Sequence, residues 1–397
     1  MSRTVLRFDN IEKIQPLCPH FVECGGCAYQ DIPYIEQLKV KEEYMKNLLM
    51  KNGFSVDVYE GIKPSPEAYG YKNKMEFSFG DYKKGGELTL GLHRKGRFMD
   101  ILSTECCKIV DDDFNAIVKS TQEYFRKSRL PHYNRKTHNG YQRFLIVRKG
   151  KNTGEILINL VTTSQVEFDL TGYVEEIKRL RLRGTLTGIL HTVDDSPSDA
   201  IKPEKIETLF GRDYIYEKIF DFMFKISPFS FFQTNTKGAE ILYGKVREYA
   251  GDIKGKKILD LYCGTGTIGI TLARDAKEVL GIELVDEAVQ AARENARLNN
   301  IDNCQFFVGD TSEALSSIGM RPDIVIVDPP RPGIGAKTAR DIIGLAPDVI
   351  VYVSCNPLSL MEDLKIWNND YSIKRIINVD MFPHTSHIEC VVLIEGK

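Results

Sequence analysis

Apolar and polar residues follow two different rhythms along the chain, and the change falls near residue 225. Before it, strand-like apolar runs come in pairs with turn residues between them, such as Gly85-Gly86. These runs are Met75–Phe79, Leu88–Leu92, Arg143–Val147 and Glu155–Val161. Helical spacing is found at Glu36–Met50. Hairpins accompanied by a helix predict a mixed α+β unit without a parallel sheet.

After residue 226, short apolar runs alternate with helical stretches such as Glu287–Leu298 and Lys337–Leu345. The runs are Lys257–Leu261, Glu278–Ile282, Cys304–Val308, Asp323–Val327, Val349–Val353 and a last one at Ile388–Ile394. This alternation predicts an α/β, Rossmann-like domain with a doubly wound, mostly parallel sheet. We therefore predict two domains, 1–225 and 226–397, with the helix at 36–50 a candidate to pack on the second.

Composition excludes several classes of protein. The 397 residues carry a net charge of -2, so the chain is not a globally basic nucleic-acid binder. No apolar run reaches the ~18 residues of a membrane helix, and no signal peptide is evident, so we expect a cytoplasmic protein. Nine cysteines, an odd number, do not indicate a disulfide framework. Nothing in the sequence indicates an obligate protein partner.

One stretch departs from the overall charge balance. Residues 122–151 hold nine Lys or Arg and a single acid, Glu123. The aromatic residues among them are Tyr124, Phe125, Tyr133, Tyr141 and Phe144. Basic side chains interleaved with aromatic ones are typical of a track for single-stranded RNA. The alternative is an ordinary solvated surface.

A glycine-rich loop follows the first strand of the predicted parallel sheet. Gly264 and Gly266 let the backbone approach a ligand closely, and Glu283 ends the next strand, where a carboxylate can bind ribose hydroxyls. NAD and S-adenosylmethionine both fit this description. Asp260, four residues before the first glycine, favours S-adenosylmethionine, because NAD folds need no acid there. A structural turn between strand and helix is the remaining alternative.

Two further loops end strands of the same sheet and should face the same cleft. One is Asp328–Gly333, and the other is Ser354–Pro357, which contains Cys355. A free cysteine is most often a small core residue, but a place at a strand end before Asn-Pro favours a reactive one.

These motifs resemble the RNA uracil-5-methyltransferases, and in particular their iron–sulfur branch, which acts on 23S rRNA. The matching segments are Phe231–Asn235, Asp260–Gly269, Asp328–Gly333, Ser354–Pro357 and Phe382–Glu389. The resemblance covers nearly the whole chain and implies a class I methyltransferase domain preceded by an α+β domain with an iron–sulfur cluster. Only seventeen residues precede Cys18, so we expect no N-terminal RNA-binding β-barrel of the kind that some members have.

The resemblance implies a role for each matching residue. Cys355 corresponds to the nucleophile that adds to carbon 6 of uracil, and Glu389 to the base that takes the carbon 5 proton. His384 and His387 are the next candidates for the base. Residues at cofactor positions are Gln233, Tyr262, Thr267, Glu283, Asp310 and Asp328, besides Asp260, Gly264 and Gly266.

Three cysteines near the start, Cys18, Cys24 and Cys27, form a C-x5-C-x2-C pattern. A fourth ligand comes from Cys106 or Cys107, and the resemblance favours Cys107. Four thiolates suit a [4Fe–4S] cluster, with zinc as the alternative metal.

The expected partner is therefore RNA, a 23S rRNA uridine first and the T-loop uridine of tRNA second. Two other functions compete with this hypothesis. An NAD-linked oxidoreductase would leave Cys355 and Glu389 without a role, and a non-catalytic RNA-binding protein would leave the glycine-rich loop without one.

Overall fold

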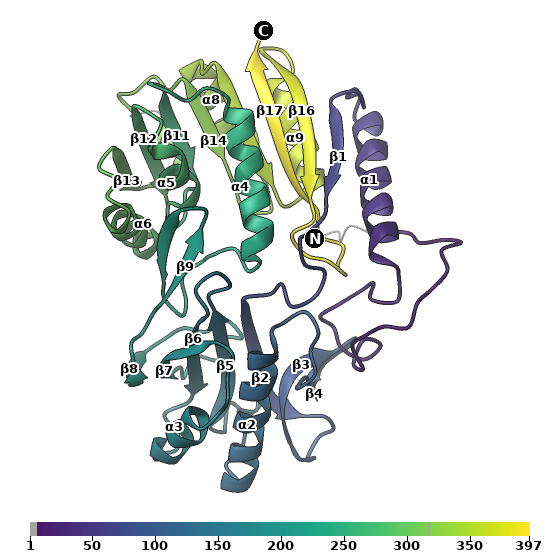
Figure 1. The fold of residues 1–397 in the computed structure, drawn as a ribbon, viewed down its shortest axis with the longest axis vertical. Helices are drawn as coiled ribbons and strands as arrows, with labels where there is room; N and C mark the ends of the chain where they lie inside the picture. The colour runs from purple at the N-terminus through teal and green to yellow at the C-terminus, as the bar shows by residue number, and fades with distance from the viewer. Residues whose placement is uncertain (1–5, 316–317) are drawn as a thin grey trace.

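Two sheets organise the computed structural model, which describes residues 6–315 and 318–397. An eight-stranded sheet forms the upper half of Figure 1 and a seven-stranded sheet the lower half. A hairpin of β9 (Ile215–Ile219) and β10 (Phe222–Ile226) lies between them. We call the two halves the upper unit and the lower unit.

The upper sheet is mostly parallel, and only β17 runs antiparallel to its two neighbours. In spatial order its strands are β1 (Tyr59–Lys63), β16 (Tyr371–Val379), β17 (Glu389–Gly396), β15 (Val349–Ser354), β14 (Ile324–Val327), β11 (Lys257–Leu261), β12 (Glu278–Glu283) and β13 (Cys304–Val308). Its helices are α1 (Tyr34–Lys51), α4 (Thr236–Ala250), α5 (Thr267–Ala273), α6 (Asp286–Leu298), α7 (Thr311–Ala314), α8 (Gly335–Leu345) and α9 (Pro357–Trp367). The predicted α/β architecture of this part is confirmed.

Alternate residues of the central strands pack into two separate hydrophobic cores, one on each face of the sheet. Ile326 of β14 belongs to the core under α4, α5 and α6, whereas its neighbour Val327 belongs to the core under α1, α8 and α9. Because both faces are covered, β14 and β15 are apolar at nearly every position. Helices on both faces leave the carboxyl ends of the parallel strands as the open edge, where ligands bind.

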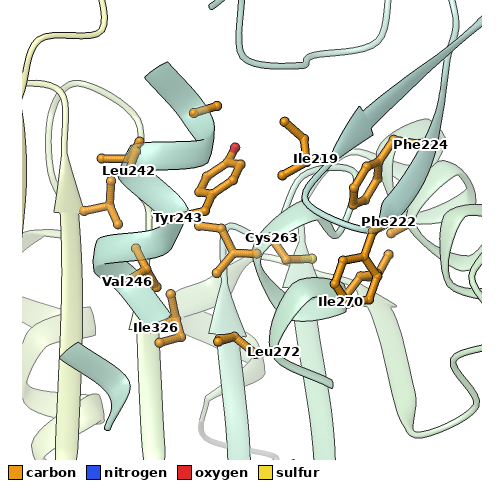
Figure 2. Packing of buried hydrophobic residues seen from close by; sticks show 14 of the residues in the cluster. Ile219, Phe222, Phe224, Leu242, Tyr243, Val246, Cys263, Ile270, Leu272 and Ile326 are labelled. Carbon is orange, nitrogen blue, oxygen red and sulfur yellow. The ribbon is translucent and has the colours of Figure 1, made fainter. Parts of the chain in front are cut away.

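The β9–β10 hairpin closes one side of the first core. Figure 2 shows Phe222 and Phe224 of this hairpin beside Ile270 of α5, with Leu242 and Tyr243 of α4 across from them. The hairpin therefore packs with the upper unit, and the chain passes through it between the lower sheet and α4.

The lower sheet is mainly antiparallel. Its spatial order is β3 (Leu88–Arg94), β4 (Arg97–Ser103), β2 (Lys74–Asp81), β5 (Gln142–Lys149), β6 (Glu155–Thr162), β7 (Thr185–Val193) and β8 (Lys205–Gly211), with helices α2 (Asp112–Ser128) and α3 (Thr171–Lys178). Both predicted hairpins are present. The expectation of no parallel pairing is wrong for two pairs of strands. β6 and β7 run parallel, joined through α3, and β2 pairs parallel with β4 through Asp81 and Asp100.

The predicted helix at 36–50 is α1, and its apolar side packs on the upper sheet through Met45 and Leu49. The strand after it, β1, adds to the edge of that sheet beside β16. No helix among the described residues has the length and apolarity needed to cross a membrane.

The structure contradicts the RNA track at 122–151. Phe125, Tyr133, Tyr141 and Phe144 are buried, and Tyr124 packs against the same core as Phe125, so these rings are not free to stack on bases. Two of the basic residues, Arg143 and Arg148, are also buried and donate to backbone carbonyls. The aromatic residues are there because α2 and β5 need apolar faces toward the core.

Candidate active site

Two loops at the carboxyl ends of neighbouring parallel strands are fastened to each other. Asp328 follows β14, and Cys355 follows β15. The carbonyl of Arg331 accepts hydrogen bonds from Asn356 Nδ2 at 2.9 Å and from Ser359 Oγ at 3.0 Å. The predicted convergence of these two loops is thus present.

Glu389 reaches the same place from the antiparallel strand. Ser354 of β15 pairs with Cys390 of β17, so Glu389, the first residue of β17, lies next to Cys355. Its carboxyl group is buried, and burial together with the charge of Asp328 raises its pKa from 4.5 to about 8. A carboxylate with such a pKa is a stronger base than an exposed one.

Cys355 is partly buried, and burial is the main cause that raises its thiol pKa to about 11, with the charges of Glu389 and Asp328 adding to the effect. Arg331 opposes this shift and lowers the pKa of both Cys355 and Glu389. The thiol also precedes the N-terminus of α9, whose dipole favours a thiolate. Arg331 therefore supplies a positive charge that favours the thiolate of Cys355.

A buried lysine beside Glu389 escaped the sequence analysis. Lys41 of α1 and Asp380 are both fully buried and form an ion pair of 2.6 Å. The charge of Lys41 also lowers the pKa of Glu389. A signal was available, because Lys41 interrupts the apolar stripe formed by Leu38, Met45 and Leu49, where a lysine is costly unless it is paired.

The glycine-rich loop has the shape that a nucleoside cofactor requires. Gly264 and Gly266 have φ angles of +53° and +76°, and a side chain on Gly264 would meet no atom within 4 Å. The space in front of Gly264 is therefore open to a ligand. Asp260 is fully buried and accepts from the amide of Gly269 through Oδ2 at 2.9 Å. Its Oδ1 has no hydrogen-bond partner among the described residues.

Burial favours the neutral form of both Asp260 and Asp328, because it raises the pKa of each to about 7. The two acids lie near each other, and neither forms an ion pair with a described side chain, so a cationic ligand would restore their ionised form. Glu283 at the end of β12 accepts from the amide of Gly264 at 3.1 Å and from that of Val285 at 3.0 Å. Its carboxylate is thereby held at the rim of the loop.

The remaining predicted cofactor residues surround this loop. Tyr262 has a φ of +61°, and its phenol lies toward Thr311 and Asp310. Asp310 caps α7 through a 2.9 Å bond from the amide of Ser312. Thr267 begins α5. All of these positions belong to the loops at the carboxyl ends of β11 and β13.

Gln233 comes from the segment before α4 and lies next to a residue that the sequence analysis missed. That residue is Tyr243, which is buried, and its phenol is close to Gln233. The charges of Asp328, Asp260 and Glu389 add to burial in raising its pKa. Tyr243 therefore lies close enough to Asp328, Asp260 and Glu389 to feel the charge of each. The sequence held no signal for it, because a tyrosine on an apolar helix face is ordinarily a core residue.

Comparison with known proteins decides which family this arrangement belongs to. The model of the tRNA (Uracil-5-)-methyltransferase family matches residues 33–397. The chain belongs to this family. It is 51% identical to an RNA methyltransferase of Clostridium tetani, over 97% of this chain and 85% of the relative. An RNA methyltransferase of Caldanaerobacter subterraneus is 50% identical over 96% of this chain and 85% of the relative.

A solved structure has the same fold over nearly the whole chain. It is the tRNA (uracil-54, C5)-methyltransferase of Pyrococcus abyssi in complex with S-adenosyl-L-homocysteine. The TM-score is 0.78 and the identity 32%, and the match covers 94% of this chain and 86% of the other. The chain is thus an RNA (uracil-5-)-methyltransferase with an α/β methyltransferase fold, and it uses S-adenosylmethionine. The NAD-linked and non-catalytic alternatives are wrong.

Four cysteines of this family member line one enclosed cavity in the lower part of the molecule. They are Cys18, Cys24, Cys27 and Cys107. Cys106, in contrast, is exposed. Burial is the main cause that raises the thiol pKa of Cys27 to about 12 and that of Cys107 to about 11, and the neighbouring thiols add to both shifts. In the described part of the chain, no three or more His, Cys, Asp or Glu side chains are grouped so that they could hold a metal ion.

The two histidines ahead of Glu389 have different surroundings. His384 is buried, its Nδ1 lies 3.1 Å from Nε2 of Gln37, and burial lowers its pKa to about 4. Its carbonyl accepts from the amides of Ala28 and Tyr29 at 2.8 and 3.1 Å. These contacts are those of a structural residue. They join the segment that carries Cys18, Cys24 and Cys27 to the loop before Glu389. His387 is exposed and packs edge-on against Phe382.

Proposed function

We propose that this enzyme methylates carbon 5 of uracil through a covalent adduct, with Cys355 as the nucleophile and Glu389 as the base. The observation that carries the proposal is the meeting of both side chains at the edge of the sheet. There, Asp328 and Arg331 act on the pKa of each. A thiol and a buried carboxyl of raised pKa are the two groups that this chemistry requires.

The reaction balances as follows. The Cys355 thiolate forms a bond to carbon 6, and the electron pair of the 5,6 double bond makes carbon 5 nucleophilic. S-adenosylmethionine, when bound, would supply the methyl group to carbon 5 and would leave as S-adenosylhomocysteine once its bond from sulfur to methyl is broken. Glu389 then takes the proton from carbon 5, the double bond forms again, and the carbon–sulfur bond to Cys355 breaks. Because Glu389 has a pKa of about 8, it accepts that proton readily.

The open, glycine-rich loop suits S-adenosylmethionine in this scheme. Glu283 would hold the ribose, while Asp260 and Asp328 would face the cationic end of the cofactor. The orphaned Oδ1 of Asp260 and the open space at Gly264 support this assignment. We propose Gln233, Tyr262, Thr267, Asp310 and Gly266 as further cofactor contacts.

We propose that Cys18, Cys24, Cys27 and Cys107 hold a [4Fe–4S] cluster, which would stiffen the cysteine segment. Their places around one enclosed cavity support a four-iron cluster, whose ligands stand apart from one another. Protein purified without oxygen should contain about four irons per chain. Cys107→Ser should lose this iron and the matched variant Cys106→Ser should keep it. Zinc in place of iron would contradict the proposal.

For the RNA, we propose a uridine of 23S rRNA, because the cysteine spacing resembles the rRNA enzymes. The T-loop uridine of tRNA is the second candidate, which the Pyrococcus abyssi structure and the family description favour. We also propose that residues 1–225, apart from α1 and β1, mainly serve RNA and the cluster, while 226–397 carry the chemistry. Incubation with each purified, unmodified RNA and labelled cofactor decides. Labelling of tRNA alone would overturn the rRNA assignment.

The mechanism has a direct test. RNA that carries 5-fluorouridine should form a denaturation-resistant complex with the enzyme, because fluorine cannot leave as a cation. Cys355→Ala should form no complex and should not methylate. Glu389→Gln should retain the nucleophile, so the adduct should accumulate even on ordinary uridine while turnover collapses. If Cys355→Ala still methylates RNA, the covalent mechanism is wrong.

A further inference from the structure

An exposed aromatic residue stands on the hairpin β3–β4 of the lower unit. Phe98 is 58% exposed, and its neighbour Met99 is 41% exposed. Leu92 of β3 lines the cavity that Cys18, Cys24, Cys27 and Cys107 also line, so the hairpin borders that cavity. Phe98 and Met99 thus form a small exposed apolar patch, and a patch of this kind is a candidate interaction surface.

One face of the Phe98 ring is already occupied. The His93 ring stacks on it at 4.9 Å with an interplanar angle of 3°, and the guanidinium of Arg135 lies 4.6 Å from its centre. Nη2 of Arg135 is 3.4 Å from Nε2 of His93, so both groups lie on the same side of the ring. The high exposure of Phe98 therefore belongs to its opposite face, which is flat, apolar and backed by a cation.

The hairpin is connected through residues 25–28 to the loop that precedes Glu389. The amide of Gly25 donates to the carbonyl of His93 at 3.2 Å, and the amide of Ala28 donates to that of His384 at 2.8 Å. Gly25 and Ala28 are three residues apart, so their Cα atoms are at most about 11 Å from each other. The segment that carries Cys24 and Cys27 therefore connects His93, on which Phe98 stacks, to the loop that leads into Glu389.

Positive charge accompanies the exposed ring. Lys95 and, on the neighbouring β2–β3 turn, Lys83 and Lys84 are exposed, and among the described side chains none of them forms an ion pair. Arg97 pairs with Asp100 only at 3.8 Å. Three nearby acids, Glu23, Asp100 and Asp199, form ion pairs with Arg94 and Arg135. A fourth, Glu87 on the β2–β3 turn, is exposed and lies 3.8 Å from Arg126. Free lysines beside an aromatic face suit a phosphate backbone with its bases.

We propose that the open face of Phe98 stacks on an unpaired base of the RNA substrate that flanks the target uridine. A target base that leaves its stack exposes its neighbours, and an aromatic platform nearby would recover part of the lost stacking. Because every base has a π face, the platform contributes affinity and register without reading sequence. The proposal rests on the proposed RNA methylation, since it needs RNA at the adjacent site.

The test compares variants of Phe98 on an unmodified RNA that the wild-type enzyme methylates. Phe98→Ala should raise the KM for RNA by about 5- to 150-fold, the loss of one stacked base, with kcat at saturating RNA unchanged. Phe98→Trp should retain the low KM, and Phe98→Leu should not. Phe220→Ala, at an exposed phenylalanine of the β9–β10 turn, is the matched control.

Several outcomes separate the possible failures. If Phe98→Ala binds and methylates RNA as the wild type does, or if Phe98→Leu serves as well as Trp, the platform is wrong while the chemistry stands. If wild-type enzyme forms no adduct with 5-fluorouridine RNA, the proposed mechanism fails first. A changed oligomeric state in Phe98→Ala, with the KM for RNA unchanged, would assign this face to protein contacts and overturn the proposal.

Discussion

Replacing Glu389, the proposed base, should stabilise the protein while destroying its activity. In the folded chain the pKa of Glu389 is raised from 4.5 to about 8, chiefly by burial. The folded state therefore retains a proton that the unfolded chain has already released. This contribution to stability is fully present below pH ~4.5 and is lost as the pH rises through about 8. Glutamine has nearly the same shape, carries no charge and titrates nowhere in this range.

The expected size follows from the shift. Between pH 4.5 and about 8, the wild type loses about 1.4 kcal/mol of unfolding free energy for each unit by which the pH rises. Glu389→Gln does not have this loss, because glutamine does not titrate. The difference between the two proteins should thus be small near pH 4.5. It should grow to about 3 kcal/mol at pH 7 and approach 5 kcal/mol above pH 8, as an upper estimate.

Urea unfolding of both proteins at a series of pH values measures this difference. Glu395→Gln, at the far end of the same strand, is the matched control and should show no such growth. A Glu389→Gln variant whose advantage is independent of pH would refute the reasoning, because burial of a charge could not then be the cause. The same variant should accumulate adduct, so one substitution separates stability from turnover.

Three other predictions concern neighbouring contacts. Glu283→Ala should weaken S-adenosylmethionine binding by about 1.5–3 kcal/mol in equilibrium dialysis, and an unchanged Kd would remove Glu283 from the cofactor site. Arg331→Gln should move the pH–rate profile to higher pH, because Arg331 lowers the pKa of both Cys355 and Glu389, whereas Arg331→Lys should leave the profile nearly in place. Gln37→Leu removes the hydrogen bonds from Gln37 to His384, in the loop before Glu389. Glu389 should then be held less firmly, so the covalent adduct between enzyme and RNA should persist longer on denaturing gels. Adduct at the wild-type level would show that Gln37 does not act on Glu389 through this loop.

The upper sheet was predictable because its strands obey simple rules. Strands buried on both faces must be apolar throughout, so Lys257–Leu261 and Val349–Val353 were located to within a residue or so. Loops at their carboxyl ends meet by topology, which brought Asp328 and Cys355 together without any structure. A sequence that predicts parallel strands therefore also predicts which loops meet at the site.

Other features depend on contacts between distant segments. The pairing of β1 with β16 leaves no local pattern in either strand, because an edge strand needs few apolar residues. The aromatic residues at 122–151 were misread because a core face and a stacking surface have the same composition. Tyr243 and Lys41 become meaningful only once their burial beside Glu389 is known.

The edge position of β1 has a consequence for how the chain is made. Tyr59 pairs with Ile376, so β1 leaves the ribosome long before the strand that completes its ladder. The whole lower sheet is synthesised in between and can fold first, since domains fold as units in the order of synthesis. During that interval α1 and β1 have no sheet to bury their apolar side. A nascent chain of this enzyme is therefore expected to expose Met45 and Leu49 to chaperones until its last few dozen residues emerge.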